Sequence, residues 1–236
     1  MPPAYLKRQR RAGLLFVLPA VIYFGGVFLV PLLESVVGSF YRTVPGGASQ
    51  FVGTRLYVKV LTDPTFWQAV GNTVSLLVMS VPLTVVAALA AALGLHRLRN
   101  LRARSAWAAM YFVPFSVSLV AAALVWQWIY DPVYGVLNHL LGTLGLPQLK
   151  WLQSLDLVRP SLALVNVWAR LGFDTVYATT QGGPAGASQT VIMLLYDTAF
   201  KFFRLGDASV MAVFVFASLL LVTLVQWRPF RREVEY

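Results

Sequence analysis

The chain has 236 residues, of which 58% are hydrophobic and 12% are charged, whereas soluble domains have about 25% charged residues. It contains no cysteine, which excludes disulfides, thiolate metal sites and cysteine nucleophiles. The net charge of +10 would favour nucleic-acid binding in a soluble chain, but most of the excess flanks long uncharged runs and therefore indicates membrane orientation.

The first predicted element is a transmembrane helix over residues 12–33, which carry no charged side chain. A membrane span needs about 20 such residues. Four basic residues precede the run and would also suit a secretory signal peptide: Lys7, Arg8, Arg10 and Arg11. Because the apolar run is longer than the core of a signal peptide, we favour an uncleaved span.

The second span is predicted over residues 70–95, which again carry no charge. Asp63 is expected to cap a helix that begins just before this span, with Trp67 at the depth of the lipid headgroups. Ala and Gly recur four residues apart in the second half of the run. This spacing suits close approach of another helix or, equally, an alanine-rich surface facing lipid.

The third span is predicted over residues 105–130 and follows a basic loop over residues 96–104. The loop contains four arginines: Arg97, Arg99, Arg102 and Arg104. The span ends in an aromatic belt: Trp126, Trp128 and Tyr130.

Residues 157–203 are predicted to be re-entrant or interfacial, because their apolar core is short and is interrupted by Arg170 and Asp174. These two residues are spaced to neutralise each other on a helix, although a polar gate is an alternative. Asn166 is expected either to bond a neighbouring helix or to face a polar pathway. Residues 208–227 are the last predicted span.

Charge placement agrees with four spans. The N-terminal tail, the basic loop and the C-terminal tail all fall on the cytoplasmic side if residues 157–203 do not cross the membrane. The expected fold class is therefore an all-α membrane protein with four transmembrane helices plus a non-spanning segment, both chain ends being cytoplasmic.

Sequence motifs for hydrolytic chemistry are missing. The chain has no GxxxxGK[ST], HExxH or GxSxG motif, and its two histidines, His96 and His139, are far apart in sequence. We therefore expect neither an enzyme nor a metal site. A membrane enzyme acting at headgroup level remains the weakest alternative.

Three segments occur in order along the chain: LTDPTFWQAVGNT (61–73), DPVYGVLN (131–138) and FDTVYATTQGGPAGASQT (173–190), with GDAS (206–209) after them. Together they resemble the maltose- and glycerol-3-phosphate-type permeases of ABC importers, in the branch that forms the first of two unlike permeases. Members of that family carry an EAA coupling loop, which docks into the ATPase. Here the loop and its flanking helices are missing between Gly172 and Asp174, so residues 1–236 resemble a truncated six-helix permease domain.

This resemblance implies a permease subunit of a binding-protein-dependent ABC importer, which moves a carbohydrate or related polar solute by alternating access with a partner permease. It also implies ABC ATPase subunits, an extracytoplasmic solute-binding protein and a location in the plasma (cell inner) membrane. The ATPase subunits would bind ATP, so no cofactor is expected in this chain. The alternative is a vestigial or structural membrane protein without transport, because the coupling loop is missing.

Candidate site residues are few. Four polar residues are candidates for lining the solute pathway: Asn72, Thr73, Asn166 and Tyr177. A second group forms a candidate external loop for contact with the binding protein: Gln181, Gly182, Gly183 and Pro184. An ordinary turn explains this second group equally well.

Overall fold

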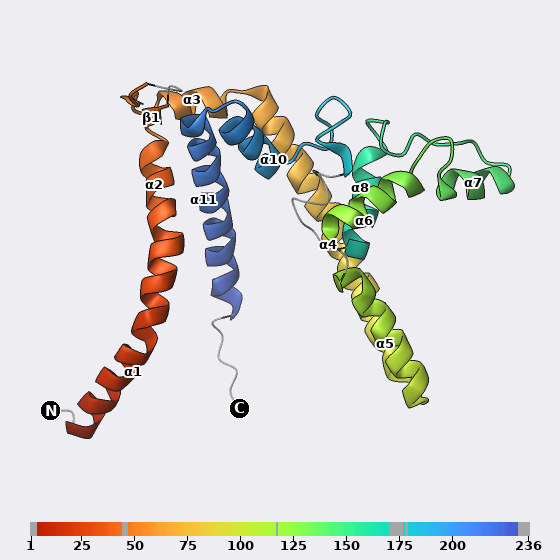
Figure 1. The fold of residues 1–236 in the computed structure, drawn as a ribbon, viewed down its shortest axis with the longest axis horizontal. Coiled ribbons are helices and arrows are strands. Elements are labelled where there is room, and N and C mark those ends of the chain that lie inside the picture. Colours follow the sequence, from red (N-terminus) through yellow and green to blue (C-terminus); the bar gives the residue numbers. More distant parts are fainter. Residues whose placement is uncertain (1–3, 44–46, 117, 170–176, 178, 231–236) are drawn as a thin grey trace. The chain divides into compact units, whose positions relative to one another are not determined.

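The computed structural model describes the chain except for residues 1–3, 44–46, 117, 170–176, 178 and 231–236 (Figure 1). The described residues are mostly helical, as the sequence predicts. They form two compact units, one of residues 1–60 with 197–236 and the other of residues 61–196. Each unit is described on its own.

The first unit is built around two long helical segments, α1–η1–α2 and α11. Its elements are α1 (Ala4–Phe24), the π-helical turn η1 (Gly25–Leu29), α2 (Val30–Gly38), strands β1 (Tyr41–Arg42) and β2 (Gln50–Phe51), α3 (Arg55–Leu61, whose last residue belongs to the other unit), the π-helical turn η2 (Asp197–Lys201) and α11 (Leu205–Phe230). The two strands pair antiparallel, and α11 packs beside α2 (Figure 1). Segments far apart in sequence therefore form one helical pair.

Small residues allow this pair to pack closely. A side chain at Gly38 would come within 3.2 Å of Ser209 Oγ on α11. Gly206 is more tightly enclosed, because a Cβ atom there would overlap the carbonyl oxygen of Tyr41 and lie 2.7 Å from Leu56 Cδ1. Glycine at position 206 therefore lets the start of α11 approach β1 and α3.

The second unit is organised along one long helix, α4. Its elements are α4 (Pro64–Arg97), α5 (Leu101–Ser116), α6 (Leu119–Ile129), α7 (Val136–Thr143), α8 (Val158–Ala169) and α10 (Val191–Tyr196). Both α8 and α10 pack against α4. A small buried core joins them: Leu76, Val158, Leu162, Ala187 and Met193.

The start of α4 confirms the predicted cap. Asp63 Oδ1 accepts a hydrogen bond of 2.8 Å from the backbone N–H of Thr65, and Pro64 occupies the first turn, where its missing N–H costs nothing. The 34 residues of α4 correspond to about 51 Å of helix, which exceeds a hydrocarbon core of about 30 Å.

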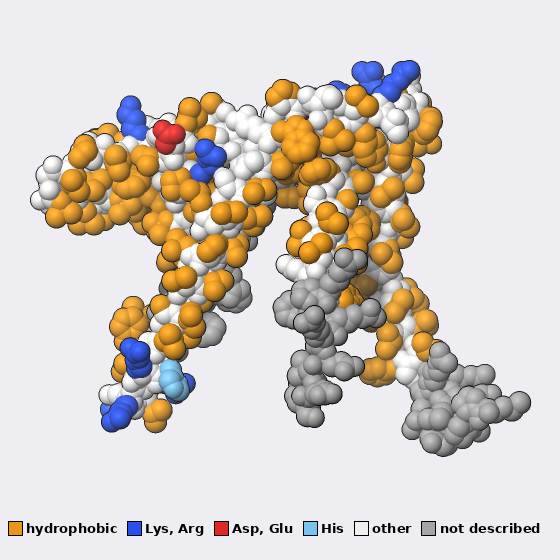
Figure 2. Space-filling model, turned by 180° about the vertical axis from the view of Figure 1, so that it is seen from behind, with side chains coloured by type: hydrophobic (Ala, Val, Ile, Leu, Met, Phe, Trp, Pro, Cys, Tyr) orange, Lys and Arg blue, Asp and Glu red, His pale blue; other side chains and the backbone are white. Residues whose placement is uncertain are grey.

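Most large apolar side chains point outward, along the lengths of the helices (Figure 2). Phe16 is 88% exposed, for example, and Leu221 is 64% exposed. In the part of the chain that the structure describes, three helical segments are long and apolar enough to cross a membrane: Gly13–Gly38, Pro64–Arg97 and Leu205–Trp227. They overlap the first, second and last predicted spans along nearly their whole length. An apolar exterior of this kind is stable only in lipid.

The third predicted span, residues 105–130, is not one helix. Ser118 adopts an extended backbone conformation (φ −57°, ψ 129°) and separates α5 from α6. Neither helix alone, at 16 and 11 residues, reaches the roughly 20 residues of a span. The absence of charged residues along a segment does not reveal such a break in the helix. The total of four transmembrane spans therefore stays a prediction.

Residues 157–203, predicted to be re-entrant or interfacial, include α8, α10 and η2. Helix α8 has 12 residues, and the re-entrant or interfacial placement of residues 157–203 stays a prediction. The proposed Arg170–Asp174 pair and the junction between Gly172 and Asp174 lie outside the described residues.

The enclosure of Gly206 leads to a stability prediction. Gly206→Ala forces the start of α11 away from Tyr41 and Leu56, and should lower the free energy of unfolding by about 1–3 kcal/mol. Gly26→Ala is the matched control in the same unit, since a Cβ there meets nothing within 4 Å. Thermal unfolding in detergent measures both, and equal midpoints would contradict the packing described for Gly206.

Candidate functional site

Asn72 on α4 holds the loop 181–190 in place. Its side-chain Nδ2 donates hydrogen bonds to the carbonyl oxygens of Gly186 (2.7 Å) and Gln189 (3.0 Å), and the residue is only 5% exposed. An amide that satisfies two loop carbonyls in a buried place fixes the loop against the helix. This predicted pathway residue therefore positions the loop.

Thr73 extends the same attachment to α10. Its hydroxyl donates to the carbonyl of Ala69 (2.8 Å) within α4 and accepts from the backbone N–H of Val191 (3.0 Å). The accepted bond satisfies an N–H at the start of α10, which has no partner inside its own helix. Gln68 adds a third contact, because its Nε2 donates to the carbonyl of Ala185 at 3.3 Å.

The predicted external loop is a tightly turned structure. Ser188 Oγ donates to the carbonyl of Gly183 (2.6 Å) and lies 2.7 Å from the hydroxyl of Thr180. Gly182 has φ +88°, a conformation in which glycine carries no Cβ penalty. Gln181 is exposed, Gly183 and Pro184 are half-buried, and Gly182 is buried, so Gln181 is the member of the predicted group most open to a partner.

Tyr177 and Asn166, the other predicted pathway residues, also lie in the second unit. The ring of Tyr177 meets that of Tyr196 edge-on at 5.7 Å and packs against the apolar core. Asn166 on α8 is 1% exposed, and neither its Nδ2 nor its Oδ1 has a hydrogen-bond partner among the described residues. A buried amide without partners is costly.

Another buried asparagine shows the contrast. Asn138 donates from Nδ2 to the carbonyls of Pro132 and Leu149, both at 2.9 Å, and its Oδ1 accepts from Trp151 Nε1 at 2.9 Å. The amide thus joins α7 to the segment before α8. In the same region, hydrogen bonds from the backbone N–H groups of Tyr134 and Val133 hold the pKa of Asp131 below its ordinary value.

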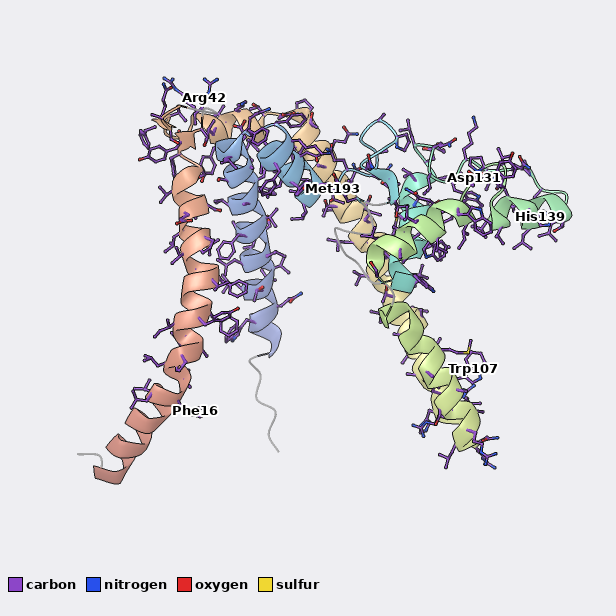
Figure 3. The ribbon with its side chains drawn as sticks, in the orientation of Figure 1. Phe16, Arg42, Trp107, Asp131, His139 and Met193 are labelled. Atoms are coloured by element: carbon purple, nitrogen blue, oxygen red, sulfur yellow. The ribbon has the colours of Figure 1, made fainter. Side chains whose placement is uncertain are left out.

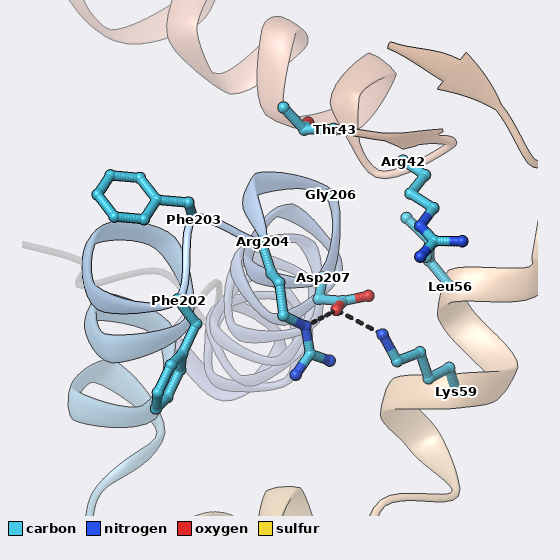
Figure 4. A pocket seen from close by; sticks show the side chains of 9 residues that line it. All are labelled: Arg42, Thr43, Leu56, Lys59, Phe202, Phe203, Arg204, Gly206 and Asp207. Carbon is cyan, nitrogen blue, oxygen red and sulfur yellow. Dashed lines mark hydrogen bonds and ion pairs between the residues drawn. The ribbon is translucent and has the colours of Figure 1, made fainter. Parts of the chain in front are cut away.

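In the first unit, Asp207 lies at the centre of a polar cavity of about 400 Å³ (Figure 4). Its Oδ2 accepts from Lys59 Nζ at 2.8 Å and from Arg204 Nε at 2.5 Å, and only 4% of its side chain is exposed. Its Oδ1 is buried and has no hydrogen-bond partner among the described residues. A buried carboxylate is tolerated here because two cations compensate it.

Sequence reasoning did not single out this cluster. The signal was Asp207 within the GDAS segment at the start of an otherwise uncharged span, where an acidic residue also suits the helix dipole. Its partner Lys59 lies 148 residues away, and one sequence does not reveal that contact. In the described part of the chain, no three His, Cys, Asp or Glu side chains are grouped as metal ligands.

Comparison with known proteins reveals relatives along nearly the whole chain. The sulfoquinovosyl glycerol transport system permease SmoG of Agrobacterium fabrum is 25% identical, over 95% of this chain and 92% of its own length. The trehalose/maltose permease MalF of Thermococcus litoralis is 26% identical, over 96% of both chains. The lactose permease LacF of Rhizobium radiobacter is 33% identical, over 70% of this chain and 55% of its own length. No protein-family model matches.

The fold is that of a solved transporter. A chain in the crystal structure of a bacterial alginate ABC transporter, in complex with an alginate pentasaccharide-bound periplasmic protein, superposes with a TM-score of 0.77 at 17% identity, over 96% of both chains. Fold, apolar helices and relatives together define a multi-pass transport subunit of the plasma membrane, and not an enzyme. The chain belongs to the ABC transporter permeases, in the group whose members serve sugar import.

The alignments also reveal an internal difference in length. They extend over 287 positions with SmoG and 294 with MalF, whereas this chain has 236 residues. At least 51 positions of SmoG and 58 of MalF are therefore aligned with no residue of this chain. Because an alignment begins and ends on matched residues, these unmatched positions are internal.

The anchoring of the loop leads to a prediction. Asn72→Ala leaves two loop carbonyls without their buried donor, which should cost about 1–3 kcal/mol and loosen the loop. Amide hydrogen exchange in residues 181–190 should become faster. Ser75→Ala is the control, because Ser75 bonds only within α4 among the interactions described. Unchanged exchange in the Asn72 variant would contradict the anchoring role.

The charge cluster around Asp207 leads to another prediction. Lys59→Met and Arg204→Met should each cost less than about 1 kcal/mol, because the remaining cation still compensates Asp207 and both cationic side chains are about half exposed. The double variant should lose about 1–2 kcal/mol more stability than the sum of the two single losses, since a buried carboxylate is then left unpaired. Asp207→Asn in the double variant should restore part of the stability; additive single effects would refute this coupling.

Proposed function

We propose that this chain is one of two permease subunits of an ABC importer that moves a carbohydrate or related polar solute by alternating access. The main support is that relatives matched along 92–96% of their length are permeases of sugar transport systems. The fold shared with an alginate importer supports the same assignment. An anionic solute fits this range as well as a neutral one, since alginate is an acidic polysaccharide.

Helix α4 supports an orientation. Asn72, which anchors the loop 181–190, and Arg97 at the other end are separated by 25 residues of helix, or roughly 37 Å along the axis. This exceeds the hydrocarbon thickness, so the two ends lie on opposite sides of the membrane. With the arginine-rich loop in the cytoplasm, as positive charge favours, the loop 181–190 faces outside and both chain ends face inside.

The outer face is the proposed side for partner contact. The solved relative was crystallised with a periplasmic protein carrying its alginate pentasaccharide. We assign the corresponding contact here to an extracytoplasmic solute-binding protein, which meets the exposed Gln181 on the anchored loop 181–184. The importer would also contain ABC ATPase subunits, which bind the ATP.

The solute pathway is assigned to the part of the second unit that holds Asn166 and Tyr177. Asn166 carries an amide donor and an amide acceptor, and Tyr177 carries an aromatic ring; sugars bind through such groups. Asn72 and Thr73 have their side chains engaged by the loop and α10, so they act on the pathway by positioning these elements.

Energy coupling is the unusual feature. We infer that the internal residues absent from this chain include the EAA loop, between Gly172 and Asp174. SmoG has at least 51 positions that match no residue of this chain. That length is sufficient for a coupling loop and its flanking helical residues. Contact with the ATPase would then be made by the partner permease alone. A vestigial protein without transport is the second candidate, and the sugar-permease relatives do not favour it.

Transport assays test this function. Removing the chain from its host should abolish uptake of one radiolabelled carbohydrate, and adding back the unmodified chain should restore it. The partner permease and the ATPase should co-purify with the tagged chain, and the solute should stimulate ATP hydrolysis.

Insertion of an EAA segment between Gly172 and Asp174 separates the two candidates. Uptake that exists before the insertion supports a working subunit coupled through its partner. Uptake gained only after insertion, and not with a Gly/Ser segment of equal length, would identify an inactive remnant instead.

A further inference from the structure

The turn between α4 and α5 concentrates positive charge. Helix α4 ends at Arg97, and α5 begins at Leu101 after only three residues, so the two helices form a tight hairpin. Asn100 Oδ1 accepts from the backbone N–H of Arg102 at 2.9 Å and thereby caps α5. The turn therefore carries four arginines within eight residues: Arg97, Arg99, Arg102 and Arg104.

Nothing nearby in the sequence neutralises this charge. The chain contains no Asp or Glu from Pro64 to Tyr130, and no ion pair involving these arginines is found among the described residues. Two of the arginines, Arg102 and Arg104, lie in the first turn of α5, where the helix dipole is itself positive. The hairpin tip is thus a concentrated site for an anion, and Figure 2 shows its arginine side chains gathered beyond an apolar stem.

An apolar cavity of about 410 Å³ lies on the hairpin directly beside this charge. Ala90 and Gly94 of α4, Leu98 of the turn and Trp107 of α5 are among its lining residues, and none of the lining side chains is charged. Trp107 projects from α5 (Figure 3) and is 51% exposed. Along α4, the lining from Ala87 to Gly94 lies roughly 5–15 Å from Arg97, the depth at which acyl chains begin beneath headgroups.

We propose that the α4–α5 hairpin binds an anionic phospholipid, with the phosphate against the arginines and an acyl chain in the cavity. The proposal rests on the membrane placement of α4 under the proposed function, and not on transport itself. Clusters of four or more basic residues beside a membrane span attract anionic lipid at about 1 kcal/mol per residue. A phospholipid uses both features at once, since one molecule carries the charge and the apolar chain.

Other occupants would use only half of the site. An acidic surface of an ATPase subunit would contact the arginines and leave the cavity empty. A helix of the partner permease would fill the cavity and leave four arginines without an anion. The adjacency of an unneutralised basic turn and an uncharged cavity therefore favours an amphiphilic anion.

The test compares lipids with matched acyl chains on the purified 236-residue chain in neutral detergent. Phosphatidylglycerol should raise the midpoint of thermal unfolding and remain bound in native mass spectra. Phosphatidylcholine and inorganic phosphate alone should do neither. Replacing Arg97, Arg99, Arg102 and Arg104 with Gln should lower the affinity for phosphatidylglycerol by about fivefold or more and remove its preference over phosphatidylcholine.

Control variants keep the result specific. Arg→Lys at the same four positions should retain the preference, and an Arg55→Gln/Arg159→Gln double variant should leave it unchanged. Ala90→Leu, which fills the cavity, should weaken phosphatidylglycerol binding while the arginines remain.

Equal binding of both lipids, or an undiminished preference in the four-Gln variant, would overturn the proposal. The proposal would also be overturned if the four-Gln variant kept its lipid binding but no longer co-purified with the ATPase. That result would assign the arginines to contact with the ATPase. Because these measurements need no transport, they can fail while the proposed function stands.

Discussion

Hydrocarbon cannot hydrogen-bond to a polypeptide, and this constraint governs most of the structure. Long helices satisfy their own backbone groups, so Gly13–Gly38, Pro64–Arg97 and Leu205–Trp227 can present apolar side chains on nearly every face. Very little of the chain forms a buried core. The forces that fix one segment against another are therefore few and local, and they involve glycines, buried amides and one carboxylate.

These local contacts divide into two kinds. Gly38 and Gly206 allow helices and backbone to approach closely, which makes dispersion contacts available without large side chains. Asn72 and Asp207 instead connect sequence-distant segments by polar bonds made away from bulk water, where an unmade bond is expensive. The same low-polarity surroundings that forbid stray charges therefore give each permitted polar contact unusual influence over the arrangement of its unit.

The sequence was informative where composition and local chemistry decide. Uncharged runs located three long helices, and Asp63 followed by Pro64 located the start of one of them. The interruption at Ser118 was not visible, because it changes backbone conformation without changing hydropathy. The loop carbonyls that bind Asn72 and the lysine that binds Asp207, Lys59, were equally hidden, since each lies more than 100 residues away and a single sequence contains no record of contacts. Candidate pathway residues could thus be named, but not their hydrogen-bond partners.

Helix α4 has a mechanical consequence. It carries the anchored loop 181–190 near its first turns and the arginine-rich turn at its last, and a hydrogen-bonded helix hardly shortens under axial load. A push on the loop along the helix axis would therefore reach the opposite end as movement or bending, and not as compression. Pro82 lies between the two ends and cannot donate a backbone hydrogen bond, so it is the place where α4 would bend.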